Sequence, residues 1–199
     1  IMELDIQGIY KAGRFVPAKT GAAAKKRYAL LDSRDGLVIR GFEKVRRDWS
    51  DIAKDTQEAV LIHILRDKSQ QKAVNAVRKS IARLEKGQAK TEELVIYTQL
   101  TKPLSEYSQI GPHVAAARKM EKAGIAVGEG SNISYIIVKG EGSISDRAEP
   151  AETAHDYDPG YYINNQVLPA ALRVLSVFGL TEEDILGSGK RKGKHNGKK

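Results

Sequence analysis

The spacing of apolar residues changes near residue 43, and this change constrains the fold more than any other feature of the sequence. Before it, apolar residues alternate loosely with polar ones and include aromatic and β-branched residues, a pattern typical of strands. After it, apolar residues recur every three or four positions, as they do along one face of a helix. We therefore expect an α+β protein with a small antiparallel β portion followed by a mainly helical part.

The first forty residues predict a β-meander that is too small to be stable alone. Its expected parts are two strands within residues 3–16 with a turn at 11–13, a loop at 17–25, a strand at 27–32, a turn at 33–36 and a strand at 37–43. Gly36 is the residue of the last turn that tolerates a positive φ. Because such strands leave unpaired edges, we expect them to dock on a further sheet.

The rest of the chain predicts helices with a few strands between them. Helices are expected from Asp48 or Ser50 to residue 66, from Ser69 to Gly87, from Pro112 to Gly124, from Pro159 with a kink at Pro169, and at 181–185. Strands are expected at 94–100 and 132–140, and a polar loop at 141–158. The tail 187–199 has no apolar residue and should be disordered.

Composition narrows the class of protein. The chain has 199 residues, 41% of them hydrophobic, and no cysteine, which excludes disulfides, thiol catalysis and cysteine-bound metals. Neither a signal peptide nor an apolar run of about 20 residues is present, so we expect a cytoplasmic protein without membrane contact. The four histidines lack ligand spacing, and no phosphate-binding glycine loop or nucleophile elbow occurs.

Positive charge is concentrated in two regions. The net charge is +8, but residues 1–50 carry +5, the tail 187–199 carries +6 and the body between them carries −3. Two basic regions that flank a mildly acidic body indicate a polyanion contacted at defined places.

Two cationic clusters lie within the first region. Lys25, Lys26 and Arg27 run into Tyr28, and on a strand Lys26 would share a face with Tyr28. A lysine and a tyrosine side by side can contact a sugar–phosphate backbone, although lysines also guard solvated strand edges. The second cluster, RRD at 46–48, directly precedes the first expected helix.

Five stretches carry a more specific signal: KKRYALLD, RGFEKVRRDWSDIAKDTQEAVL, LTKPLSEYSQIGPHVAAARKM, ISYIIVKGEGSISDRA and YDPGYYINNQVLPAALRVL. In this order and at these spacings they resemble the C-terminal part of archaeal family B DNA polymerases. The resemblance covers nearly all of residues 3–186. Five collinear blocks are far more specific than any one of them.

The resemblance implies a division of the chain and a set of DNA contacts. Residues 1–46 would be the last strands of the palm, residues 47–186 the thumb that grips product duplex, and residues 187–199 a basic tail. The Lys-x-Tyr motif, here Lys26 and Tyr28, would contact the primer near its growing end.

Two further motifs would contact the duplex backbone. The residues that match them are Arg46, Arg47 and Asp48 in the first motif, and Thr101, Lys102, Tyr107, Gly111 and His113 in the second. The second motif includes a helix N-terminus, whose free N–H groups also suit a phosphate on physical grounds.

The departures from the family matter as much. The palm aspartates that bind the two catalytic metals are absent, and only Asp5 falls near the metal site, where the family usually has Glu. Ser108 and Ser143 replace family cations, and the tail lacks the family's peptide for the sliding clamp, so clamp binding is not expected. Two-metal phosphoryl transfer needs bridging carboxylates, so the chain should be inactive alone.

The resemblance leaves two origins open, and two other classes compete with it. The chain is either cut from a longer polymerase or the small subunit of a split one, which Met2 and the basic tail favour. A large subunit would then hold Mg²⁺ and share primer–template DNA with this chain. The alternatives are a stand-alone basic nucleic-acid-binding protein and a structural adaptor with a solubilising tail.

Overall fold

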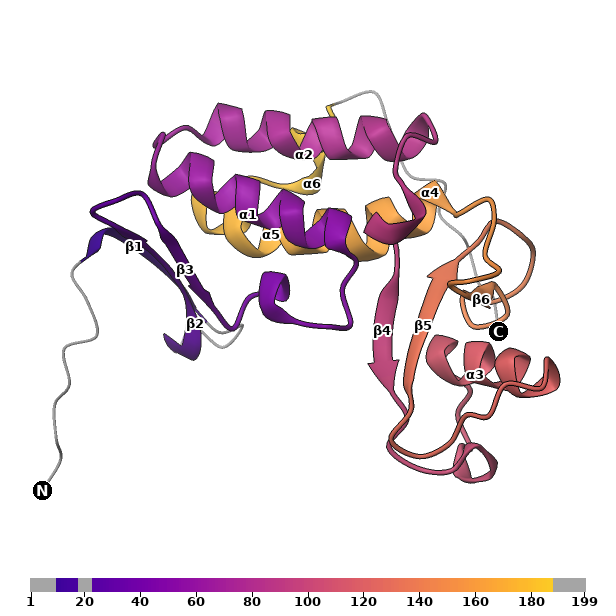
Figure 1. The fold of residues 1–199 in the computed structure, drawn as a ribbon. Helices are drawn as coiled ribbons and strands as arrows, with labels where there is room; N and C mark the ends of the chain where they lie inside the picture. Colours follow the sequence, from indigo (N-terminus) through magenta and orange to yellow (C-terminus); the bar gives the residue numbers. More distant parts are fainter. Residues whose placement is uncertain (1–9, 18–22, 188–199) are drawn as a thin grey trace, which may run out of the picture.

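A computed structural model describes residues 10–17 and 23–187, and within them two small antiparallel sheets lie at opposite ends of a layer of helices (Figure 1). The first sheet contains β1 (Tyr10–Pro17), β2 (Ala23–Asp32) and β3 (Leu37–Arg40), and the second contains β4 (Ile96–Gln99), β5 (Asn132–Ile137) and β6 (Ala148–Pro150). The helices are α1 (Asp51–Leu65), α2 (Gln70–Glu85), α3 (Pro112–Lys122), α4 (Pro159–Tyr161), α5 (Leu168–Leu175) and α6 (Glu182–Leu186). The α+β prediction is confirmed.

The first sheet has the order β1-β2-β3 and is joined to the helices by its apolar face. Ala29 and Leu31 on β2 and Ile39 on β3 are buried and belong to the same core as α1. The turn expected at residues 11–13 is wrong, because β1 runs through these residues with a shift in its pairing to β2 between Tyr10 and Ala12. Such a bulge bends a strand without ending it. The expected strand residues 3–9 lie outside the described residues.

The turn between β2 and β3 lies where the sequence predicts it, but Asp35 carries the positive φ (64°) instead of Gly36. The Asp32 carboxylate accepts hydrogen bonds from the backbone N–H groups of Arg34 (2.7 Å) and Gly36 (2.8 Å), and aspartate tolerates the left-handed region. Gly36 is required for space, since a Cβ there would lie 2.4 Å from Asp32 Oδ2.

Helices α1, α2 and α5 enclose the largest part of the core. Between α1 and α2 the chain turns at Ser69, whose hydroxyl caps α2 by accepting a hydrogen bond from Lys72 N (3.2 Å). Gly87 (φ 69°) follows the end of α2. The short α6 is held against α2 by Arg78, which donates to Ile185 O at 2.6 Å. Within the described ranges, no helix combines the length and apolarity needed to cross a membrane.

The helix that begins at Pro159 changes its winding before Pro169, where the sequence predicts a kink. A π-helix (Tyr162–Val167) separates α4 from α5, and Leu168 N donates to Ile163 O, five residues back. Proline lacks an N–H group and its ring crowds the carbonyl four residues earlier. The wider π turn accommodates the proline without ending the helix.

The second sheet has the order β4-β5-β6 and packs against α3. Buried Tyr162 ties it to the helices, because its hydroxyl donates to Leu94 O (2.9 Å) and accepts from Ile137 N (3.2 Å). The prediction of a continuous loop at 141–158 is wrong, since β6 lies within it. Three residues are too few to produce a periodic pattern, and the burial of Ala148 and Pro150 appears only once β5 is beside them.

Candidate nucleic-acid interface

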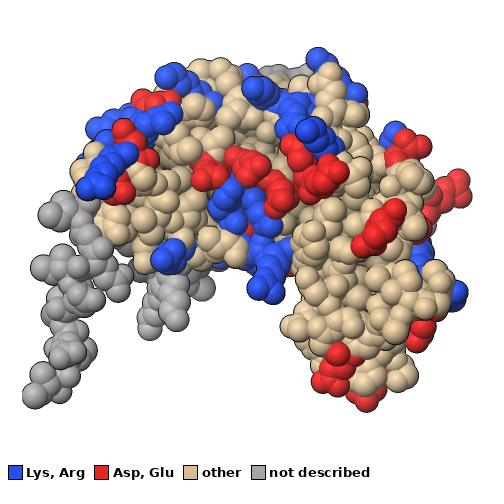
Figure 2. All heavy atoms as spheres, in the orientation of Figure 1, with Lys and Arg blue, Asp and Glu red and all other residues tan. Residues whose placement is uncertain are grey.

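The two sheets lie on the same side of the helical layer, at its two ends (Figure 1). The surface between them is hollowed (Figure 2), and we call it the concave face. Residues 43–50, which we call the bridging segment, run along this face and join β3 to α1. The segment begins with a 3₁₀ turn, η1 (Glu43–Val45). Figure 2 shows Lys and Arg atoms gathered over this stretch, in the hollow between the two ends of the molecule. Lys and Arg side chains therefore line the middle of the hollow, with Asp and Glu side chains beside them.

Arg46, Arg47 and Asp48 lie together on the bridging segment and are all exposed. Asp48 accepts two hydrogen bonds from Arg46, at 2.9 Å to Nε and 2.5 Å to Nη2, and these bonds raise the pKa of Arg46. In the described part of the chain, the side chain of Arg47 has no ion-pair partner. Asp48, predicted as a DNA contact, is thus placed as the residue that orients Arg46, and Arg47 is open to an anion.

The Lys26–Tyr28 pair is described only in part. Both residues lie on β2, and half-buried Tyr28 pairs with Phe15 and Arg40 on its two neighbours. The pairing of β1 with β2 is irregular between Tyr28 and Ala23, so the face that Lys26 shares with Tyr28 stays a prediction. Arg40 lies directly opposite Tyr28 and is exposed. It was missed, although the turn at 33–36 sets the register that places it there.

The residues predicted from the second motif form one group, which we call the Tyr107 cluster: Thr101, Lys102, Tyr107, Gly111 and His113. The Tyr107 hydroxyl accepts a hydrogen bond from Thr101 N at 2.9 Å. Lys102 Nζ lies 4.8 Å from the Tyr107 ring centroid, within cation–π range. The His113 ring meets Tyr107 edge-on, with centroids 5.9 Å apart. The predicted residues are therefore brought together in space.

The features of the Tyr107 cluster that suit an anion are the ammonium group of Lys102 and the free N–H groups at the N-terminus of α3. Hydrogen bonding from Thr101 lowers the pKa of Tyr107, and desolvation lowers the pKa of His113. Gly111 caps α3 and Pro112 occupies its first turn, as predicted. A Cβ on Gly111 would lie 3.2 Å from the His113 ring, so glycine leaves room for the imidazole beside the N-terminus of the helix.

Strand β4 connects the bridging segment to the Tyr107 cluster. Tyr97 N, on β4, donates to Arg47 O at 3.3 Å, and the chain reaches Thr101 four residues later. An extended chain advances about 3.3 Å per residue, so Arg47 and Thr101 are roughly 13 Å apart along the strand. The two groups of predicted contacts are therefore joined by one short strand.

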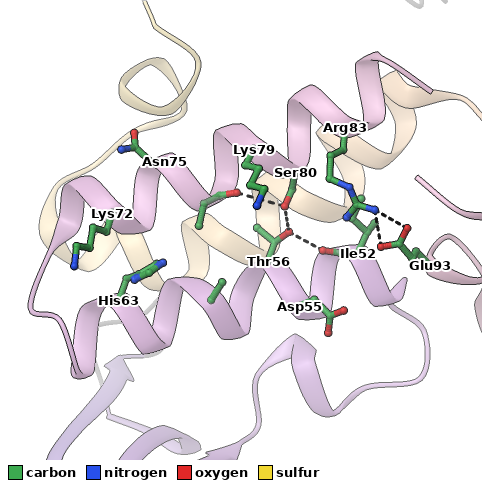
Figure 3. Close-up of a pocket in the computed structure, with 12 residues that line it drawn as sticks. Ile52, Asp55, Thr56, His63, Lys72, Asn75, Lys79, Ser80, Arg83 and Glu93 are labelled. Atoms are coloured by element: carbon green, nitrogen blue, oxygen red, sulfur yellow. Dashed lines mark hydrogen bonds and ion pairs between the residues drawn. The ribbon is translucent and has the colours of Figure 1, made fainter. Parts of the chain in front are cut away.

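A second hollow, between α1 and α2, has a different character (Figure 3). It measures about 510 Å³, and two pairs of its polar side chains are bonded to one another. Thr56 Oγ1 donates to Ile52 O (2.6 Å) and lies 2.7 Å from Ser80 Oγ, and Arg83 forms an ion pair with Glu93 at 2.8 Å. These bonds join the two helices to each other and to the chain after them. The concave face, with its open Arg47, is the better candidate site.

Metal ligands are not grouped in the part of the chain that the structure describes. Among residues 10–17 and 23–187, no cluster of three or more His, Asp or Glu side chains could hold an ion. Asp5, which the resemblance described under Sequence analysis places near the metal site, lies outside the described residues. The residues described do not fit a catalytic Mg²⁺ centre.

The fold is α+β, and lysine and arginine side chains lie in its hollow, which suits a polyanion. Comparison with known proteins identifies the family. The model of DNA polymerase family B matches residues 3–178. A DNA polymerase of Thermococcus aggregans is 49% identical over 189 residues, which are 93% of this chain and 10% of that protein. A DNA polymerase of Thermococcus gorgonarius is 45% identical over 93% of this chain and 24% of its own length.

The fold of this chain is also similar to part of a solved family B polymerase structure. The family B DNA polymerase from the hyperthermophilic archaeon Pyrobaculum calidifontis superposes with a TM-score of 0.73 at 36% identity, over 89% of this chain and 23% of that one. The chain therefore belongs to DNA polymerase family B. It spans between about a tenth and a quarter of the length of these relatives, and the resemblance to their C-terminal part agrees with this coverage.

Proposed function

We propose that this chain supplies the thumb and the primer-duplex contacts of a family B DNA polymerase, and that a large partner subunit supplies the metal-binding aspartates. The observation that carries the proposal is the concave face, on which the bridging segment and the Tyr107 cluster lie at the two ends of β4. Membership of DNA polymerase family B supports primer–template DNA as the ligand of this face.

The spacing of the two groups suits a nucleic-acid backbone. Successive phosphates of one strand of a B-form duplex rise about 3.4 Å along the axis, so two groups roughly 13 Å apart can contact different phosphates of one backbone. Contacts to phosphate fix the position of a duplex without reading its sequence. A polymerase requires this kind of grip, because it must hold every sequence that it copies.

The division of labour follows from the residues on each chain. The partner would hold Mg²⁺ and the nucleotide and carry out the chemistry. Lys26 and Tyr28 would hold the primer end in line, which is a contribution of positioning. Arg46 and Arg47 would neutralise backbone phosphates, with an affinity that falls as salt rises.

The test is primer extension with Mg²⁺ and nucleotides, using this chain alone, the catalytic fragment of a family B polymerase from the same cell alone, and the two mixed. We expect efficient extension only in the mixture, together with co-elution of the two chains. If the mixture is no more active than the catalytic fragment and the chains elute apart, the proposal fails. Salt-sensitive duplex binding by this chain in that case would identify a stand-alone nucleic-acid-binding protein.

A further inference from the structure

At the base of the bridging segment lies a group of three polar residues, two of them buried, that has no part in the DNA contacts proposed above. The Glu43 carboxylate is 1% exposed and Gln57, on α1, is 0% exposed. Gln57 Nε2 donates to Glu43 Oε2 at 2.7 Å, and Arg173 Nε, on α5, donates to Glu43 Oε1 at 3.3 Å. Glu43 is therefore bonded to both helices at the base of the segment.

Gln57 binds the backbone of the bridging segment at Lys44 as well as the side chain of Glu43. Its Oε1 accepts a hydrogen bond from Lys44 N at 2.9 Å, and its Nε2 also donates to Ala170 O at 2.8 Å. One turn later, Arg46 N donates to Glu43 O at 2.9 Å. The backbone of the segment is therefore held at Lys44 by Gln57, and the backbone of Arg46 is bonded to that of Glu43.

The other end of the segment is held in the same way. Gln166, on the π-helix, accepts hydrogen bonds from Ser50 N (3.0 Å) and Ser50 Oγ (3.1 Å), and both residues are buried. Two buried glutamines thus fix the two ends of a short stretch whose middle is exposed. Arg46 and Arg47 therefore lie between two stretches of backbone that are held by hydrogen bonds to buried side chains.

Stability alone is a poor reason to bury this charge. A buried ion pair loses most of its attraction to the cost of desolvation, and apolar residues of similar volume often serve as well. Buried polar groups instead specify one arrangement, because any other leaves a donor or a carboxylate unpaired. A unique arrangement has value where a pair of surface cations must meet phosphates at a set position.

We infer that Glu43, Gln57 and Arg173 are positioning residues that set where Arg46 and Arg47 meet the duplex backbone. They do not touch DNA themselves. The inference rests on the proposed function, since it assumes that the two arginines bind phosphate.

The test compares duplex affinity and its salt dependence for four forms of the full chain: wild type, Glu43→Gln, the double variant Arg46→Ala/Arg47→Ala, and all three changes together. We expect Glu43→Gln to weaken binding about three- to tenfold and to reduce the salt slope by about 1, as loss of one phosphate contact would. With both arginines absent, Glu43→Gln should have no further effect. A merely structural role for Glu43 would not make its effect depend on the arginines.

A matched control separates positioning from general weakening of the fold. Val77→Ala removes buried volume from α2, and it should lower the unfolding temperature without changing the salt slope. If Glu43→Gln does not fold at the assay temperature, Arg173→Gln removes the counter-charge from a partly exposed position and should give the same dependence on the arginines.

The outcomes distinguish this inference from the proposed function. If the arginine variant loses affinity but Glu43→Gln and Arg173→Gln keep it, the positioning role is wrong and the proposed function stands. An equal loss in the presence and absence of the arginines also overturns the positioning role. If removing both arginines leaves affinity unchanged, or the wild-type chain in complex with its partner binds no duplex, the assigned DNA contacts fail and the inference fails with them.

Discussion

Arg40 lies opposite Tyr28 on the neighbouring strand, and its position bears on the predicted contact between Lys26 and the primer. Directly opposed residues of antiparallel strands present their side chains on the same face. Tyr28 therefore has a cation beside it in the structure, whichever way Lys26 points. A tyrosine next to an exposed guanidinium is suited to a sugar–phosphate backbone near a primer end.

Lys26→Ala tests the predicted role in primer positioning. In the assembled polymerase, we expect the rate of nucleotide addition to fall by tenfold or more, on the order expected for a misplaced reactant, with duplex affinity falling only a few fold. Single-turnover incorporation and equilibrium binding measure the two quantities. Lys79→Ala, an exposed cation of the α1–α2 hollow, is the control. An affinity loss that accounts for the whole loss of rate would contradict positioning.

His113 predicts a pH dependence of DNA binding. Desolvation lowers its pKa below the ordinary value of 6.5, so the free ring is neutral at pH 7. A bound phosphate favours the charged ring and raises that pKa. Binding then takes up a proton, and duplex affinity should increase as the pH falls from 7.5 to 6, by up to about tenfold per unit.

The measurement is the dissociation constant of the duplex at several pH values for wild type, His113→Gln and His155→Gln. The change should disappear in His113→Gln and persist in His155→Gln, since His155 is exposed and far along the chain from the Tyr107 cluster. A pH dependence that survives in His113→Gln would show that the proton is bound elsewhere.

The π-helix (Tyr162–Val167) has a structural role, because it places Gln166 beside the start of α1. Its wider turn carries Gln166, which accepts both hydrogen bonds from Ser50 at the start of α1. Ser50 is the N-cap residue of α1 but makes no side-chain cap bond to that helix. The π-helix therefore anchors the start of α1 from outside, in place of an ordinary cap.

Gln166→Ala should destabilise the fold, because it leaves the buried N–H of Ser50 without an acceptor. We expect the free energy of unfolding to fall by roughly 1–3 kcal/mol. Denaturant unfolding measures it, with the exposed neighbour Asn165→Ala as the control, which should change it by less than about 0.5 kcal/mol. Equal effects of the two variants would mean that the Ser50 bonds contribute little.

Helices and strands that begin or end at a proline or glycine could be predicted from the sequence. Features that depend on pairing with another strand could not. Pro112 and Gly124 bound α3 in the structure as they do in the sequence. The bulge of β1 and the whole of β6 depend on the strand beside them, so no local pattern reports them.

The residues of the candidate site also fall into those that sequence motifs identified and those that only packing brings together. The family motifs identified the Tyr107 cluster and the arginines of the bridging segment. They did not identify the groups beneath: Glu43 and Arg173 are 130 positions apart in the sequence, and their burial follows from the packing of α1 against α5. Charge complementarity over such a distance leaves no signal in a single sequence.

At the scale of the whole molecule, the predicted basic tail and the concave face should bind DNA independently. Removing residues 188–199, which carry six Lys and Arg residues, keeps Gly187 and the whole of α6. The variant should bind duplex more weakly and with a smaller salt slope, because fewer counterions are released. Its unfolding temperature should not change, and a clear drop in that temperature would contradict the separation of tail and fold.

The ion pair between Arg46 and Asp48 has a further consequence if the concave face holds product duplex. Both side chains are about half exposed, and such pairs contribute about 0–1 kcal/mol, so a phosphate can replace Asp48 at little cost and Asp48 can replace the phosphate in turn. When the duplex advances by one nucleotide, Arg46 does not have to remain bare between one phosphate and the next. Asp48 would pair with Arg46 while no phosphate is in contact with it, and this would lower the barrier to movement of the duplex by one nucleotide.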